Sequence, residues 1–348
     1  MLKTRSMAEA LASRQNGPAM EPQVQVREAT AADGPALAEI ERNSPLVFAD
    51  GSSLRIDRRD DYFAAARLMA GATVMLAEVD GEPAGAICGA LHRVLLGGAE
   101  RRMLYIHHAR ILPRYQNTGL GRRVSFALMD RFKAEGYDSP YWYVATDNAQ
   151  SQSFNRNSPG KWSFGPTCVT MRCSENAGPA YGRPATPGDA AEVVHILNSC
   201  HDGEEMFFPY SVESLTERLG RDPRQYGWQN LWLGDGAVVG VWPEAEWISI
   251  VHTDPAGNTT FNGNAAVADY GFLPGAENEL RSLLRAWCSS LEERGMAELT
   301  AFTSPNTRAW PVFRGLAGEL SHYDLWTPGV AEPEGATSRG LYVDHLYF

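Results

Sequence analysis

An internal repeat constrains the fold of this chain more than any other feature. Residues 27–40 (REATAADGPALAEI) and residues 183–196 (RPATPGDAAEVVHI) align at a constant offset of 156. The shared positions are Arg27, Ala29, Thr30, Asp33 and Ile40 in the first copy and Arg183, Ala185, Thr186, Asp189 and Ile196 in the second. A Thr or Asp ahead of an amphipathic run is typical of a helix N-terminus. Both copies therefore predict a strand end followed by a capped helix.

The correspondence continues along both halves of the chain. Asp80-Gly81 lies between two apolar runs, and Asp235-Gly236 occupies the matching place at offset 155. Asp-Gly in this context predicts a two-residue β-hairpin. Gly136 and Gly295 are each predicted to end a helix. Matching elements in the same order indicate duplication of one domain.

Each half is predicted to contain a strand, a helix, a hairpin meander, a long strand and then α, β, α. The predicted fold class is therefore α/β, with two tandem domains that each consist of a twisted mixed sheet flanked by helices. The 348 residues, 44% of them hydrophobic, suffice for two cores. We place domains at 23–173 and 183–348, separated by a polar linker at 174–182. Residues 1–22 are predicted to be a disordered leader, with a transit peptide or an upstream start as alternatives.

The composition excludes several classes of function. A net charge of −11 argues against nucleic-acid binding and favours a cationic acceptor. No apolar run reaches 18 residues, so no membrane span is expected. The five cysteines are scattered and form no zinc-site pattern, so no metal is expected. Free thiols are typical of a reducing cytoplasm. We expect a cytoplasmic monomer or homodimer.

The most specific motif is the segment 111–123, ILPRYQNTGLGRR. An apolar strand at 103–111 is predicted to precede it, and a helix at 121–133 to follow. Such a junction exposes backbone N–H groups at a helix N-terminus, where the helix dipole favours an anion. Gly119 and Gly121 leave no Cβ in the way of a phosphate group. Two arginines directly after the glycines add positive charge.

This segment resembles the pyrophosphate-binding motif V/I-x-P-x-Y-Q/R-x-x-G-x-G/A of the GNAT superfamily of acyl-CoA-dependent N-acyltransferases. The matching residues are Ile111, Pro113, Tyr115, Gln116, Gly119 and Gly121. The resemblance implies that acetyl-CoA or another acyl-CoA is the cosubstrate, and that a small-molecule or peptide amine is the acceptor. The implied cofactor-binding residues are Ile111, Leu112, Gln116, Asn117, Thr118, Gly119, Leu120, Gly121, Arg122, Arg123, Asn148 and Phe154. In that fold, acyl-CoA enters a gap between two central strands that splay apart.

The two halves differ at this motif. The second half keeps Pro274 but has lost the two glycines, and Glu277 and Glu279 stand where a pyrophosphate would lie. Negative charge there opposes phosphate binding. We therefore expect one acyl-CoA site, in the first half, and a degenerate second domain. The tyrosine that often acts as general acid in the family is replaced by Asn155 and Phe313, which leaves the acid unassigned.

Acyl transfer to an amine needs a base and a donor that stabilises the thioester oxyanion. The family often carries its base on the strand before the phosphate loop. Strand alternation places Tyr105 and His107 on one face and His108 on the other. His107 is the first candidate because an imidazole titrates near neutrality, and Tyr105 and His108 are alternatives. His201 is another, in a polar segment that would bind a cationic amine across a cleft together with Asp202, Glu204 and Glu205.

The leading functional prediction is an N-acyltransferase, first of all an N-acetyltransferase. The amine would attack the thioester directly in a ternary complex. The absence of the usual tyrosine supports an alternative, a non-catalytic acyl-CoA sensor on the same scaffold. A third hypothesis is acylation of an alcohol, or transfer of an aminoacyl or succinyl group.

Overall fold

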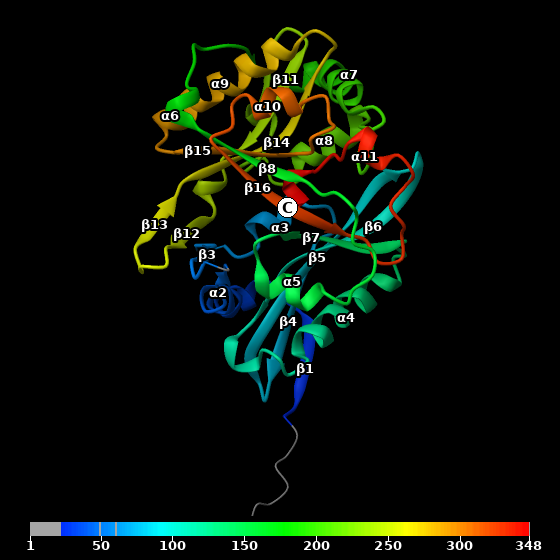
Figure 1. Ribbon diagram of the computed structural model, residues 1–348, viewed down its shortest axis with the longest axis vertical. Coiled ribbons are helices and arrows are strands. Elements are labelled where there is room, and N and C mark those ends of the chain that lie inside the picture. Colours follow the sequence, from blue (N-terminus) through cyan, green and yellow to red (C-terminus); the bar gives the residue numbers. More distant parts are fainter. Residues whose placement is uncertain (1–21, 49, 60, 348) are drawn as a thin grey trace, which may run out of the picture.

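The computed structural model describes residues 22–48, 50–59 and 61–347. Of the predicted leader, only residue 22 falls within this part. A sheet of twelve strands runs through both halves in the order β1-β4-β5-β6-β7-β16-β8-β15-β14-β11-β10-β9 (Figure 1). Helices cover this mixed sheet, so the predicted α/β class is confirmed. In the part of the chain described, no helix is long and apolar enough to cross a membrane.

The order of elements repeats between the two halves. The first half contains β1 (Val24–Glu28), α2 (Gly34–Arg42), β2 (Leu46–Val47), β3 (Ser53–Asp57), α3 (Ala64–Leu68), β4 (Thr73–Val79), β5 (Glu82–Leu96), β6 (Ala99–Ile111), α4 (Leu120–Lys133), β7 (Ser139–Ala145), α5 (Ala149–Asn155) and β8 (Thr167–Arg172). The second half contains α6 (Cys173–Asn176), β9 (Arg183–Pro184), α7 (Ala190–His201), α8 (Val212–Gly220), β10 (Leu231–Leu233), β11 (Ala237–Trp242), β12 (Ser249–Thr253), β13 (Thr259–Asn262), β14 (Asn264–Phe272), α9 (Glu277–Glu293), β15 (Glu298–Thr303), α10 (Trp310–Arg314), β16 (Glu319–Trp326) and α11 (Ala336–Arg339).

The sequence repeat recurs as a repeated set of contacts. Arg27 pairs with Asp33 at 2.7 Å, and Arg183 pairs with Asp189 at the same distance. Each aspartate also accepts a hydrogen bond from a threonine backbone N–H three residues earlier, at 2.7 Å and 2.8 Å. These contacts fix the turns that lead into α2 and α7. The identities at offset 156 are therefore the residues that join strand to helix.

The predicted Asp-Gly hairpin of the first half is present. Val79 pairs with Glu82 across the two-residue loop, and Asp80 and Gly81 both adopt positive φ values, 53° and 83°. Positive φ at both central residues is the geometry that favours Asp-Gly. In the second half, Asp235 and Gly236 connect β10 to β11.

The final strands of the two halves are exchanged. β16, from the second half, lies beside β7 of the first half, with Leu325 opposite Tyr143. β8, from the first half, lies beside β15 of the second half, with Val169 opposite Ala301. β16 and β8 also pair with each other at the centre of the sheet. Each half therefore completes its sheet with a strand from the other half.

A second, four-stranded sheet also links the halves, in the order β13-β12-β3-β2, on the left of Figure 1. β3 of the first half pairs with β12 of the second half, with Ile56 opposite Ile250. Two separate sets of backbone hydrogen bonds thus hold the halves together. The position of one half relative to the other is set by hydrogen-bond register rather than by a flexible linker.

Dividing the chain between α6 and β9 would deprive each half of the strand that the other half contributes to the twelve-stranded sheet, β16 for the first half and β8 for the second. A fragment of residues 22–178 keeps β8 but lacks β16, which leaves an edge of β7 unpaired and prone to association. We expect each fragment expressed alone to aggregate, and the two fragments expressed together to copurify one to one. Affinity capture through a tag on one fragment measures this. Separate fragments that are monomeric and melt cooperatively would contradict the inference.

Candidate functional site

The loop between β6 and α4 leaves a helix N-terminus without a cap. After a single turn at Pro113–Tyr115, the backbone is left-handed at Asn117 (φ 62°) and Gly119 (φ 85°). Gly119 is the N-cap of α4 and has no side chain to bond the first turn. Residues 116–119 form a turn, and no side chain at the N-cap bonds the N–H groups of the first turn of α4. Uncapped N–H groups at the positive end of a 14-residue helix are suited to binding an anion, which makes this loop the candidate anion site.

Side chains of the loop hold this conformation. The Gln116 side chain donates to the Ile111 carbonyl at 3.1 Å and accepts from Gln150 of α5 at 3.1 Å. The Thr118 hydroxyl donates to the Tyr115 carbonyl at 2.7 Å. The predicted glutamine of the motif therefore closes the loop and tethers it to α5.

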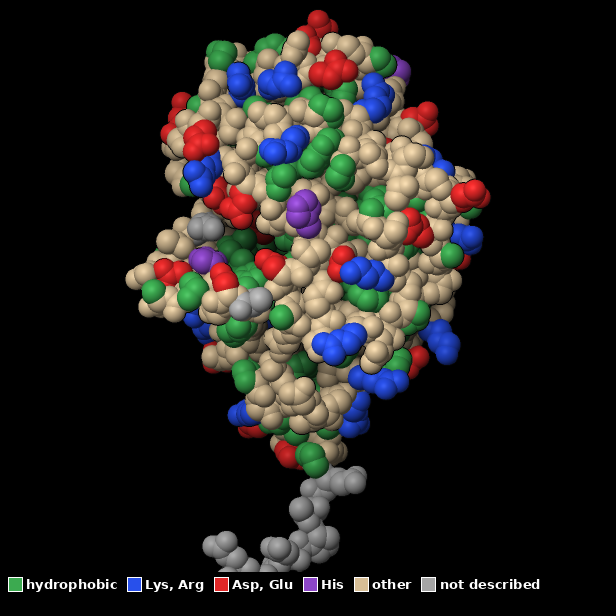
Figure 2. All heavy atoms as spheres, in the orientation of Figure 1, with side chains coloured by type: hydrophobic (Ala, Val, Ile, Leu, Met, Phe, Trp, Pro, Cys, Tyr) green, Lys and Arg blue, Asp and Glu red, His purple; other side chains and the backbone are tan. Residues whose placement is uncertain are grey.

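Exposed cations flank the loop. Arg122 and Arg123 lie on the first turn of α4, and neither forms an ion pair with another described residue. Figure 2 shows Lys and Arg side chains gathered at the lower right, over the region where Figure 1 draws α4. Positive charge at this end of the helix strengthens the attraction for a phosphate group.

The two further residues predicted to contact the cofactor differ in their surroundings. Asn148 is buried and accepts a hydrogen bond from the Ser151 backbone at 3.0 Å, which caps α5. Phe154, on the same helix, is 66% exposed. We assign Asn148 a structural role, whereas Phe154 is free to cover a ligand.

Two neighbouring parallel strands separate at the same place in each half, β6 from β7 in the first and β14 from β15 in the second. β6 pairs with β7 only at Met103–Tyr105, and β14 pairs with β15 only at Asn264–Ala266. Tyr105 lies eight residues before Pro113, and Ala266 lies eight residues before Pro274. The duplicated fold thus contains two equivalent gaps.

Residues 341–347 fill the gap of the second half. The Leu341 backbone N–H donates to the Ser304 hydroxyl at 2.8 Å, at the end of β15. On the other side, Arg218 bridges Asp344 at 2.6 Å and Asp269 of β14 at 3.1 Å. A ligand inserted between β14 and β15 would have to displace this segment.

His201 belongs to the core of the second half. Its side chain is 1% exposed, and its two nitrogens bond Glu204 and the Tyr270 carbonyl, both at 2.7 Å. Glu205 is also buried and pairs with Arg339. These residues stabilise the fold and do not line an open cleft, which differs from the role predicted for them.

A β-bulge changes the predicted arrangement of the two histidines on β6. Cys88 pairs with His107, and Ala86 pairs with Arg110, so two residues of β6 oppose one residue of β5. His108 adopts a φ of 50°, and the Nδ1 atoms of His107 and His108 lie 2.5 Å apart. The expectation of opposite faces is therefore wrong, because the bulge interrupts the alternation.

The electrostatic environment keeps both histidines neutral. Burial lowers the pKa of His107 to about 3, and the nearby Arg58 and Arg110 contribute to the shift. The same causes lower the pKa of His108. His107 stacks on Tyr105 at a ring distance of 4.8 Å, and its Nε2 atom is buried without a hydrogen-bond partner in the described structure. At neutral pH, His107 is a weak base.

A cluster that the sequence analysis did not identify lies close to these histidines. Arg58, directly after β3, donates from Nε to Glu41 of α2 at 2.5 Å, and its guanidinium lies 5.1 Å from the ring centre of Tyr62. Glu41 and Leu37 are one helical turn apart on the buried face of α2. A charged residue on an apolar helix face was the one signal available in the sequence.

The second half contributes Glu244 to the same region. Arg59 donates to the carbonyls of Ala245 and Glu246, at 2.5 Å and 3.2 Å, which anchors the turn Glu244–Glu246 beside β3. Burial raises the pKa of Glu244 to about 7, and the positive charge of Arg58 opposes this shift. A carboxyl group with this pKa can accept a proton at neutral pH.

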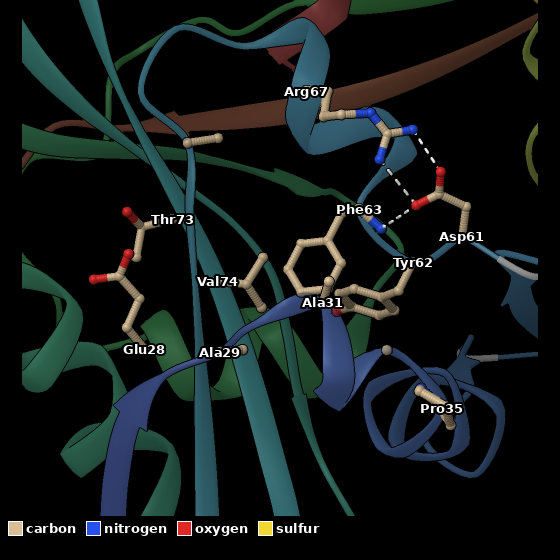
Figure 3. A pocket seen from close by; sticks show the side chains of 12 residues that line it. Glu28, Ala29, Ala31, Pro35, Asp61, Tyr62, Phe63, Arg67, Thr73 and Val74 are labelled. Carbon is tan, nitrogen blue, oxygen red and sulfur yellow. Dashed lines mark hydrogen bonds and ion pairs between the residues drawn. The ribbon is translucent and has the colours of Figure 1, made fainter.

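Two surface pockets flank α2. One, of about 520 Å³, lies between β1, β4 and the segment before α3 (Figure 3). Its arginine, Arg67, is already paired with Asp61 and Asp222. The other, of about 440 Å³, is lined by Leu112, Pro113 and Arg114 of the loop together with residues of α2 and β5. The second pocket adjoins the candidate anion site, whereas the first does not.

The described residues contain no cluster of His, Cys, Asp and Glu side chains suited to a metal ion.

Comparison with known proteins agrees with these observations. Residues 36–156 match the model of the acetyltransferase (GNAT) family. No curated protein sequence matches the chain. A Saccharomyces cerevisiae N-myristoyltransferase with bound myristoyl-CoA is similar in structure, with a TM-score of 0.60 and 11% identity over 88% of this chain and 84% of that one. The same yeast enzyme with myristoyl-CoA and inhibitors gives 0.64 and 10%, over 89% and 81%. At these identities the likeness concerns the fold.

Proposed function

We propose that this chain, whose residues 36–156 form a GNAT-family domain, is an acyl-CoA N-acyltransferase with a single acyl-CoA site in its first half. The observation that carries the proposal is the uncapped N-terminus of α4 beside the gap between β6 and β7. In the second half, the matching gap holds residues 341–347, and Glu277 and Glu279 occupy the first turn of α9. Carboxylates there repel a pyrophosphate.

The reaction requires three events at this site. The amine nitrogen attacks the thioester carbon, the carbon–sulfur bond breaks, and CoA leaves as a thiol while the amine loses a proton to a base.

The bulge in β6 leaves one residue of that strand without a partner in the ladder. We therefore propose a backbone N–H at His108 or Ala109 as the donor to the oxyanion. Asn155 is buried and bonds the Ser151 carbonyl, which argues against a role as acid toward the thiolate.

Glu244 is our candidate for the base, in place of His107. The pKa of His107 is about 3, whereas that of Glu244 is about 7. The positive charge of Arg58 lowers the pKa of both groups. A base works best when its pKa lies near the working pH. His107, neutral and with Nε2 open, then helps to orient the amine.

Binding of CoA tests the phosphate loop. We expect isothermal titration to give one site per chain, and Gly119→Ala to weaken CoA binding at least about tenfold, because an added Cβ strains the left-handed N-cap. Gly136→Ala is the matched control, since Gly136 has a φ of 74° near the other end of α4. Both variants should lose about 1 kcal/mol of stability. Two equivalent CoA sites, or equal effects of both variants on CoA affinity, would contradict the assignment.

Acetyl is the expected acyl group, because buried aromatic rings close the base of the first gap. Tyr105 lies 5.0 Å from Tyr141 and 6.3 Å from Tyr347, centre to centre. We expect thiol release in the presence of amine acceptors to be at least about 100-fold faster with acetyl-CoA than with myristoyl-CoA, since a long chain would have to displace these rings. Comparable rates with both donors would disprove the short-chain assignment. CoA binding without thiol release from any amine would favour a sensor.

The role of Glu244 predicts a specific pH dependence. Below about pH 7 the carboxyl group is protonated, so kcat/KM should rise with pH and level off above that value. In Glu244→Gln, this rise of kcat/KM with pH should be absent, and the value of kcat/KM above pH 7 should be about 10²- to 10⁴-fold lower than in the wild type. Because burial raises the pKa above the unfolded value, the native state binds the proton more tightly. The carboxyl group therefore lowers the stability of the wild type as pH rises through about 4.5 to 7, and the variant should lack this effect.

Glu246→Gln is the matched control for this experiment. Glu246 lies on the same turn, is exposed and pairs with Arg294. We expect its pH–rate profile to equal that of the wild type. If kcat/KM of Glu244→Gln still rises with pH near pH 7, the base is another group.

A further inference from the structure

Arg58 is a buried cation whose only hydrogen bond to a described residue is made by its Nε atom. Its side chain is 3% exposed, and its Nε atom bonds Glu41. A guanidinium has five N–H donors. In the described part of the chain, the two Nη groups of Arg58 have no hydrogen-bond partner. With one described partner for five donors, the Nη edge of this guanidinium is available to a ligand.

Other buried polar atoms around Arg58 also lack a hydrogen-bond partner among the described residues. Glu41 is 1% exposed and uses only Oε2 toward Arg58, while its Oε1 atom is buried without a partner among the described residues. The same holds for His107 Nε2, and the Tyr62 hydroxyl has only the Cys88 thiol beside it. These groups come from three different segments that meet at Arg58. Chance misfit at one side chain does not account for such a convergence.

Most groups that face Arg58 carry no charge. Burial raises the pKa of Tyr62 and that of Cys88, the latter to about 12, so both stay protonated. Burial and the two arginines lower the pKa values of His107 and His108, so both histidines stay neutral.

The charged groups in this region are Arg58, Arg110, Glu41 and Glu244. Glu41 is bound to Arg58, and Glu244 is only partly ionised near pH 7. Arg110 has a hydrogen bond to the Ala109 carbonyl and no carboxylate partner within the described residues. While Glu244 is protonated, positive charge exceeds negative charge here, although the whole chain carries −11; when Glu244 ionises, the two carboxylates balance the two arginines. The excess of positive charge in the first state favours an anionic group on the ligand.

Local backbone geometry gives Arg58 its inward position. Arg59 has a φ of 50°, in the left-handed region that arginine rarely adopts. This conformation buries Arg58, while Arg59 reaches the carbonyls of the turn that carries Glu244. The segment that carries Arg58 is thereby fixed against the turn that carries Glu244, and the charge of Arg58 lowers the pKa of Glu244. Strained conformations of this kind are retained where the surrounding contacts determine them.

We propose that the acceptor amine carries a carboxylate, and that the Nη groups of Arg58 bind this carboxylate. The planar fork of a guanidinium matches the two oxygens of a carboxylate. The acceptor is then an amino acid or a related amino carboxylic acid, with its amine directed toward Glu244. This inference rests on the proposed acyltransferase function for the reaction, but the carboxylate site can be tested without turnover.

The first experiment compares matched acceptors, each an amino acid paired with its own carboxamide. We expect the wild type to acylate the acids with kcat/KM at least about tenfold higher, because a buried charge-assisted pair is lost with the amide. The double variant Glu41→Gln/Arg58→Gln removes both charges, so no unpaired charge is left buried. In this variant the preference should fall to within about twofold, with unchanged affinity for CoA.

Glu39→Gln/Arg42→Gln is the matched control. These residues form an exposed pair at 2.6 Å on the same helix, so the control makes the same chemical changes away from the site. It should keep the wild-type preference. A wild type that acylates amides as well as acids, or a Glu41→Gln/Arg58→Gln variant that keeps the preference, would overturn the proposal.

The second experiment measures binding of the reaction product. N-acetyl amino acids should raise the melting temperature of the wild type more than their carboxamides do, through preferential binding to the native state. Glu41→Gln/Arg58→Gln should abolish the difference. If no amine is acylated but this difference is present, the proposed catalysis fails and the carboxylate site stands. If acids and amides shift the melting temperature equally, the carboxylate site is refuted whether or not acyl transfer occurs.

Discussion

The exchange of β8 and β16 is the constraint on which the rest of the structure depends. Backbone hydrogen bonds between β7, β16, β8 and β15 join the halves into one sheet, and the β3–β12 pair adds a second connection. Because register is fixed by these ladders, residues of different halves can be positioned to within a hydrogen bond. The contacts of Arg59 with the turn that carries Glu244 depend on this. A site shared by two halves is possible because the halves cannot shift relative to one another.

Duplication has led to two different uses of the same gap. In the first half, the end of β6 leads into a helix N-terminus without a side-chain cap. Buried polar atoms of Glu41 and His107 in the same half lack a hydrogen-bond partner among the described residues. In the second half, the matching strand and helix enclose residues 341–347 through Arg218 and its two aspartates. Filling that gap with protein makes it part of the core. The second copy contributes stability and the groups that face the first.

The sequence was sufficient to predict what depends on local residues. The paired caps at Thr30 and Thr186, the hairpin at Asp80-Gly81 and the loop at Gly119 all follow from short-range chemistry. The strand exchange was not predictable, because either pairing of β8 and β16 satisfies the same apolar patterns. The bulge at His108 was missed because a regular strand was assumed. The contact of Arg59 with the Ala245 carbonyl, which brings the turn of Glu244 to β3, joins residues 186 positions apart, and neither lies in a recognisable motif.

The path of residues 341–347 has a consequence for how the molecule is made. This segment crosses the gap of the second half and ends with Tyr347 stacked on His92 of β5, while the Ala70 backbone N–H donates to the Tyr347 hydroxyl. The first half therefore receives part of its packing from residues that the ribosome adds hundreds of positions later. During synthesis, the loop proposed to bind the pyrophosphate emerges long before the ring that closes the neighbouring gap. The order of translation thus delays assembly of the complete site until the chain has been made through residue 347.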